Sequence, residues 1–198
     1  MKRVLLICLS LVLALVGWSA VGAEDGFYVI PSMKVVPKTG QTATYGTRDD
    51  GALQKGVASP TPRFTDNGNG TVTDNLTRLI WMKNANAFGR IQWADALTAA
   101  NGLKSGDAGT GLTDGSKAGD WRLPNVRELQ SLVDYDSYNP ALPAVNPFTN
   151  VQLYYYWSSS TYAASPSLAI MVNFYKGGQS HDDKNTFYYY VWCVRGGQ

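Results

Sequence analysis

The fold class is decided by residues 168–195, LAIMVNFYKGGQSHDDKNTFYYYVWCVR. Within residues 168–175, Leu, Ile, Val and Phe alternate with Ala, Met, Asn and Tyr, which is the two-residue period of a strand. Residues 187–195 are aromatic and β-branched, so they favour a second strand. The polar residues 177–185 lie between the two runs. This pattern predicts an antiparallel hairpin with a long polar tip.

Two helices are predicted upstream of this hairpin. The first covers residues 92–101, where Trp93 and Leu97 fall on one face, and Gly102 follows as a left-handed helix end. The second covers residues 125–133, NVRELQSLV, in which Asn and Glu stand three residues apart, as in a capping box.

A tight hairpin turn is predicted at residues 66–70, DNGNG, because Asn and Gly accept positive φ angles. Residues 71–73 follow as a strand, and the apolar run 79–82 predicts a buried strand. Two helices followed by a C-terminal third that favours strands predict an α+β fold. We expect two helices packed on a twisted antiparallel sheet, with long irregular loops.

The first residues have the pattern of a signal peptide. Lys2 and Arg3 precede the apolar run 4–16, and Val21 and Ala23 fit a cleavage site, which predicts a signal peptide over residues 1–23. The alternative is an uncleaved anchor, for which the apolar run is short.

Two further segments are expected after the cleavage site. Residues 24–62 are rich in Gly, Thr, Pro and Lys, which predicts an extended N-terminal arm with a short strand at 27–30. Residues 63–198 form the predicted domain.

The composition excludes several classes of protein. The chain of 198 residues has a formal net charge of +2, too small for a protein that neutralises nucleic-acid phosphates. Aromatic residues make up 12% of the chain, which is not a disordered composition. Cys193 is the one cysteine after residue 23, so we expect it to be buried, with pairing between chains as the alternative.

A catalytic site is not expected. The one histidine, His181, lies in a Gly-rich polar segment, and the chain contains no HExxH, CxxC or phosphate-binding loop. Neighbouring carboxylates such as Asp134 and Asp136 are expected to be hydrated. We predict no cofactor. Calcium at residues 66–74 is a weaker alternative, because the segment mixes Asp, Asn and Gly but lacks the EF-hand pattern.

The aromatic residues of the predicted hairpin suggest a ligand-binding surface. Tyr188, Tyr190 and Trp192 share one face of an unbroken strand, and they would point outward if Cys193 points inward. Tyrosine and tryptophan bury much area at low entropic cost in binding sites. The alternatives are a face covered by the arm and an interface between copies of the chain. The residues assigned to the ligand site are Tyr155, Asn173, Tyr175, His181, Asp182, Lys184, Tyr188, Tyr190 and Trp192.

An ordered set of short segments resembles one protein family. The segments are TGQT (39–42), DDG (49–51), RFTDNGNGTVTD (63–74), LIW (79–81), WRLP (121–124), EL (128–129), YWSSS (156–160) and CVRGG (193–197). Together they resemble the C-terminal domain of Legionella collagen-like adhesins over about residues 37–197. The RLP and EL segments and the RGG end also resemble the formylglycine-generating, C-type-lectin-like superfamily.

The resemblance implies a C-type-lectin-like fold over residues 63–198 and a location outside the cytoplasm. In the adhesins, the related domain binds sulfated polysaccharides and supports attachment. This chain departs from them because it has no Gly-X-Y repeat. It also departs from the formylglycine-generating enzymes, whose chemistry depends on a pair of cysteines, because Cys193 stands alone after residue 23.

We therefore expect an exported, non-catalytic binding protein, located in the periplasm, at the cell surface or in the medium. Its expected partner is a cell-surface or matrix glycan, or a surface protein, with no nucleic acid and no membrane span after cleavage. A structural or assembly subunit of an envelope complex is the alternative, and a homo-oligomer is left open. An enzyme of formylglycine-generating-like fold is the remote alternative.

Overall fold

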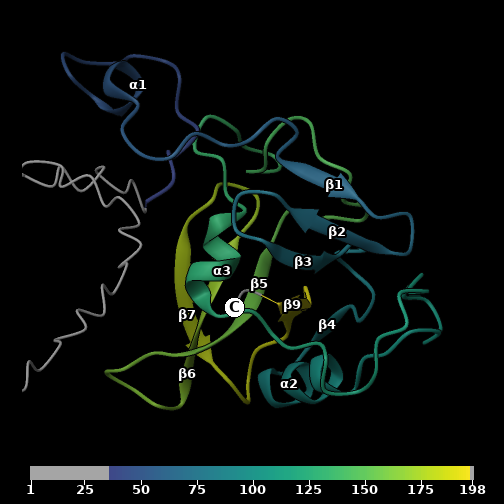
Figure 1. Ribbon diagram of the computed structural model, residues 1–198. Coiled ribbons are helices and arrows are strands. Elements are labelled where there is room, and N and C mark those ends of the chain that lie inside the picture. Colours follow the sequence, from purple (N-terminus) through teal and green to yellow (C-terminus); the bar gives the residue numbers. More distant parts are fainter. Residues whose placement is uncertain (1–35, 197–198) are drawn as a thin grey trace, which may run out of the picture. The chain divides into compact units, whose positions relative to one another are not determined.

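The structure, a computed structural model, describes residues 36–196 (Figure 1). The predicted signal peptide over residues 1–23 and the predicted strand at 27–30 lie outside the described residues. The described residues belong to one compact unit, Lys34–Gln198. They form an α+β fold in which the strands make two sheets.

The first sheet has four strands in the order β1-β2-β3-β9, all antiparallel. Its strands are β1 (Phe64–Asp66), β2 (Thr71–Asp74), β3 (Leu79–Met82) and β9 (Val194–Gly196). The predicted turn at 66–70 is confirmed, because β1 pairs with β2 and both Gly68 and Gly70 have positive φ. The buried strand predicted at 79–82 is β3.

The second sheet has five strands in the order β4-β8-β5-β6-β7. Its strands are β4 (Arg90–Ile91), β8 (Tyr189–Tyr190), β5 (Tyr155–Thr161), β6 (Leu168–Asn173) and β7 (Gln179–Asp183). All its pairs are antiparallel except β5 with β8, which is parallel. The expectation of one antiparallel sheet was therefore wrong.

The two predicted helices are present as α2 (Trp93–Gly102) and α3 (Val126–Ser131), after the short α1 (Asp50–Leu53). The capping box of α3 is confirmed, because the Asn125 side chain accepts from the Glu128 N–H while Glu128 accepts from the Asn125 N–H. α3 packs on β5 and β6 (Figure 1). The predicted end of α2 was wrong, because Gly102 lies inside the helix and does not take a positive φ.

Trp192 joins the two sheets in the core. Its buried ring lies 5.9 Å from that of Trp81 on β3 and 5.5 Å from that of Tyr156 on β5. Its indole N–H donates to the Met82 carbonyl oxygen at 2.8 Å. Trp81, Trp121 and Trp157 are also fully buried.

The predicted C-terminal hairpin was wrong in two respects. The polar stretch 177–185 contains strand β7, which pairs with β6. The run 187–195 is not one strand, because β8 belongs to the five-stranded sheet and β9 to the four-stranded sheet. Residues 191–193 carry the chain through the core between the sheets, so Trp192 and Cys193 are both buried. The alternation that placed Trp192 outside does not hold across this break.

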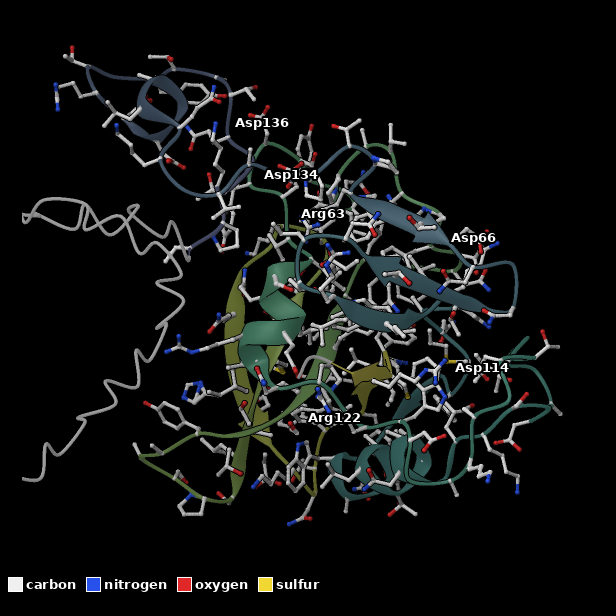
Figure 2. The ribbon with its side chains drawn as sticks, in the orientation of Figure 1. Arg63, Asp66, Asp114, Arg122, Asp134 and Asp136 are labelled. Atoms are coloured by element: carbon white, nitrogen blue, oxygen red, sulfur yellow. The ribbon has the colours of Figure 1, made fainter. Side chains whose placement is uncertain are left out.

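Residues 36–62 contact the loop that follows α3. The Tyr135 N–H donates to the Thr39 carbonyl oxygen at 2.9 Å, and the Thr42 hydroxyl donates to Asp136. Figure 2 labels Asp134 and Asp136 beside this part of the chain, with Arg63 next to them. Tyr188 stays exposed, so the described part of the arm does not cover it.

Candidate functional site

An aromatic surface lies over the start of β5 and the segment leading into β8. We define it as Tyr154, Tyr155, Phe187, Tyr188 and Tyr189. Three of its rings are exposed, by 42% for Tyr154, 41% for Phe187 and 53% for Tyr188. The centroid of the buried Tyr189 ring lies 5.7 Å from that of Tyr154, 5.4 Å from that of Tyr155 and 6.1 Å from that of Phe187.

The sheet topology explains why these rings gather. Strands β7 and β8 are separated by β5 and β6, so residues 184–188 must cross one face of the sheet. The register places Trp157 and Asp182 on that face. Tyr189 lies across it, 4.8 Å from the Trp157 ring and with its hydroxyl donating to Asp182 at 2.6 Å.

The crossing also explains the burial of two residues on β6. Ala169 and Met171 alternate with the larger apolar residues of this strand, yet both are buried. They pair with Asp182 and Ser180 on the face that the crossing segment covers. Tyr189 lies in the same covered environment. Its burial raises the pKa of its hydroxyl well above the ordinary range, and the neighbouring Asp182 carboxylate raises the pKa further.

An open hollow of about 390 Å³ lies beside the exposed rings. It is lined by Tyr154, Thr186, Phe187, Tyr188, Tyr189 and Arg90. The side chain of Arg90, on the edge strand β4, is exposed and supplies a guanidinium at the rim. Aromatic faces and a guanidinium, with its several hydrogen-bond donors, can together hold a ligand that is partly apolar and has polar groups at its edge.

Two residues of the predicted site hold the crossing segment in place. The Lys184 ammonium donates to the Thr161 hydroxyl and the Pro166 carbonyl oxygen, both at 2.8 Å, and lies 4.1 Å above the Trp93 ring. Asp182 accepts the hydroxyl of Tyr189. These contacts make both residues supports for the aromatic surface.

His181 lies apart from the aromatic surface. It is exposed and its ring packs 4.1 Å from that of Tyr162. In strand β7 it alternates with Asp182, so the two side chains point to opposite faces of the sheet. This geometry does not join His181 to Asp182 in a catalytic arrangement.

The remaining predicted site residues are spread over different environments. Tyr155 belongs to the aromatic surface, while Tyr190 is half-buried with its ring 5.5 Å from that of Tyr156. Asn173 is buried and accepts from the N–H of Tyr175 at 2.7 Å, and Tyr175 itself is exposed. The outward position predicted for Trp192 was wrong, because the ring lies in the core.

Sequence reasoning missed Arg90, Tyr154, Phe187 and Tyr189. The aromatic run at 154–156 did signal an exposed ring, because neighbours in a strand alternate in direction. Arg90 carried no local signal, since it reaches the site only through the pairing of β4 with β8.

The carboxylates proposed as calcium ligands have protein partners. Asp66 pairs with Lys83 at 2.7 Å, and Asp74 accepts two hydrogen bonds from Arg63. Among residues 36–196, no group of three or more His, Cys, Asp or Glu side chains is arranged to hold a metal ion.

Two arginines of the family-like segments have structural roles. Arg122 donates two hydrogen bonds of 2.7 Å to Glu128, which ties the RLP segment to the cap of α3. Arg195 pairs with the buried Asp114 at 3.0 Å and lies over the Trp121 ring. Figure 2 places Arg122 and Asp114 in separate parts of the fold.

Comparison with known proteins identifies the family. The sequence profile of the Lcl C-terminal domain matches residues 70–195. The chain belongs to the Lcl C-terminal domain family. No curated protein and no solved structure matches the chain.

Membership in the Lcl C-terminal domain family makes this an adhesin-related domain and confirms the resemblance to the domain of Legionella collagen-like adhesins. All five residues of the aromatic surface, together with Arg90, lie inside the matched range. The described part of the predicted arm, residues 36–62, lies outside it. Within residues 36–196, no helix has the length and apolar character needed to cross a membrane.

Proposed function

We propose that the protein is an exported, non-catalytic binding protein that recognises a glycan of a cell surface or matrix through the aromatic surface. The observation that carries this proposal is that three exposed aromatic residues line one hollow together with Tyr189 and Arg90. The C-type-lectin-like assignment of the fold and the location outside the cytoplasm are parts of the same proposal, supported by the family.

The chemistry of the surface suits a sugar. A pyranose ring has a face of C–H groups that can lie on an aromatic ring, and its hydroxyls require hydrogen-bond partners at the edge. Tyr154, Tyr188 and Phe187 offer the aromatic faces, and the tyrosine hydroxyls and Arg90 offer the polar partners. The guanidinium of Arg90 also suits a sugar that carries an acidic group.

The surface is held rigidly, which favours its use in binding. Tyr189 is anchored by Asp182, and the turn into the crossing segment is closed by Asp183, which accepts from the N–H groups of Asn185 and Thr186 at 3.0 Å. Rings that are already ordered lose little conformational entropy when a ligand binds.

A glycan array probed with the protein expressed from the full chain tests the proposal, with calcium in one set and a chelator in the other. We expect reproducible binding to one glycan class. We also expect the binding to survive the chelator, because no group of three or more His, Cys, Asp or Glu side chains among residues 36–196 is arranged to hold a metal ion. Tyr188→Ala should lower the affinity about tenfold, the value of one stacked ring. Tyr45→Ala, at an exposed tyrosine of the arm, is the matched control and should bind like the unsubstituted protein.

Unchanged binding in Tyr188→Ala would place the site elsewhere. An array without any binding would favour the assembly-subunit alternative. In that case the solution mass should rise with protein concentration, and Tyr188 should become protected from solvent in the assembly.

A further inference from the structure

We infer that the site has a second subsite at Tyr138 and Tyr175, so that the ligand is a polysaccharide chain held in two places. We call these two residues the tip tyrosines. Tyr175 lies in the turn at the tip of the β6–β7 hairpin, and Tyr138 precedes Asn139, which hydrogen-bonds to this turn. The inference rests on the proposed function and extends it from a single hollow to a longer track.

Backbone contacts connect the tip tyrosines to the aromatic surface. The Phe174 N–H donates to the Tyr154 carbonyl oxygen at 3.0 Å, so the β6–β7 turn lies directly beside Tyr154. The Asn139 N–H donates to the Tyr175 carbonyl oxygen at 2.8 Å, which brings Tyr138 beside the same turn. Four neighbouring segments therefore carry tyrosines in the order Tyr189, Tyr154, Tyr175 and Tyr138.

Both tip tyrosines are available to a ligand. Tyr138 is 75% exposed and Tyr175 is 45% exposed. A second hollow of about 400 Å³ adjoins Tyr138 and is also lined by Asp136, Ser137 and Asn146. It therefore repeats the combination of an exposed ring with polar groups at its edge.

The turn that carries Tyr175 is fixed by its neighbours. Asn173 accepts from the N–H of Tyr175 at 2.7 Å and from the N–H of Gly177 at 2.7 Å. Gly177 has a φ of +79°, and a Cβ at this position would lie 2.7 Å from a methyl group of Val133. The turn is thus locked against the residues after α3, so the position of Tyr175 relative to Tyr154 is set before a ligand arrives.

The length of the track decides the kind of ligand. Three steps between neighbouring segments, from β8 to the loop of Tyr138, span about 14 Å if each step equals the usual spacing of hydrogen-bonded strands. This distance exceeds one pyranose ring. A saccharide long enough to reach both subsites meets the second one at a high effective concentration once the first is bound. The affinity should therefore rise steeply with the length of the saccharide.

Calorimetric titration of the full chain with two ladders of oligosaccharides tests the inference. The probes are heparin-derived and chitin-derived oligosaccharides, each from the disaccharide to the longest soluble member. We expect the longest member of the ladder that binds to have at least about tenfold higher affinity than its disaccharide.

Substitutions then separate the two subsites. The double variant Tyr138→Ala/Tyr175→Ala should keep the disaccharide affinity and lose the gain with length to within about twofold, whereas Tyr188→Ala should weaken both ligands. Tyr45→Ala is again the control. Thermal unfolding of each variant checks that it is folded. We expect an unchanged midpoint, because the substituted side chains are exposed.

The outcomes distinguish the two ideas. A double variant that keeps the full gain with length overturns the second subsite while leaving the proposed function in place. Equal affinities for short and long members in the unsubstituted protein overturn it as well. If Tyr188→Ala changes no affinity, or neither ladder binds, the proposed function fails and the inference fails with it.

Discussion

Replacing Asp74 with asparagine should lower the free energy of unfolding by about 3–5 kcal/mol, the usual cost of breaking a buried ion pair from one side. The Asp74 carboxylate is fully buried and accepts from Arg63 at 2.8 and 2.9 Å. It also accepts from the Leu76 N–H and the Thr77 hydroxyl, both at 2.9 Å. An asparagine at this position would place its NH2 group, a donor, against other donors. It would also leave the nearly buried Arg63 guanidinium without a counter-charge.

The effect should extend beyond the β1–β2 hairpin, because the Arg63 guanidinium also donates to the Ser131 carbonyl oxygen at 2.9 Å. Ser131 is the last residue of α3, so the buried pair connects the four-stranded sheet to the helix that packs on the other sheet. We therefore expect a loss of global stability.

Asp66→Asn is the matched control on the same hairpin. Its ion pair with Lys83 is about one-third exposed, and asparagine retains the oxygen that accepts from the Gly68 N–H. The expected cost is at most about 1 kcal/mol, as for surface pairs. Urea denaturation followed by tryptophan fluorescence measures both variants, and equal m-values would show that only stability changed.

The reasoning is refuted if Asp74→Asn costs less than about 1 kcal/mol at an unchanged m-value, or costs no more than the control. A double variant, Arg63→Leu/Asp74→Leu, provides a second check. It should be more stable than Asp74→Asn, because removing both charges leaves no uncompensated ion in the interior.

Three further predictions concern the arm, the core and acid stability. Gly40→Ala should speed proteolysis within the arm while leaving the unfolding midpoint nearly unchanged. Gly40 has a φ of +98°, and a Cβ there would collide with the Asp134 carboxylate. The control is Gly46→Ala, which should have no effect because a Cβ at Gly46 would meet open space. Trp192→Ala should lower the free energy of unfolding by about 3–5 kcal/mol in urea denaturation, as for other fully buried aromatic rings. The exposed Tyr188→Ala should change it by no more than about 0.5 kcal/mol. Similar losses in the two variants would contradict the core position of Trp192. Hydrogen bonds to the carboxylates lower the pKa values of four aspartates that are exposed or half-buried. The stability that they contribute is therefore present above about pH 4 and is lost as the pH falls through the lowered pKa values. A thermal midpoint that does not fall in acid would contradict this. These residues are Asp49, Asp66, Asp136 and Asp183.

Local features were predictable from the sequence because their causes lie within a few residues. The capping box of α3 needs only Asn125 and Glu128 at the right spacing, and the turn at 66–70 needs only residues that accept positive φ. The apolar run at β3 likewise marked a buried strand without reference to its partners.

The candidate site was only partly predictable. Tyr155 and Tyr188 were assigned to it from the sequence, and the structure places both at the aromatic surface. Arg90, Tyr154, Phe187 and the supporting role of Asp182 depend on the route that residues 184–188 take across the sheet. That route follows from the order of the strands, which no periodicity along the chain specifies.

Residues 187–195 separate the two levels most clearly. Their composition determined that they would be extended and rich in aromatic rings, because β-branched and aromatic side chains favour strands. The tertiary structure alone decided that β8 and β9 belong to different sheets, with Trp192 buried between them. A strand's periodicity sets which side chains share a face, but contacts with residues far away in the chain decide which faces are buried and where the strand ends.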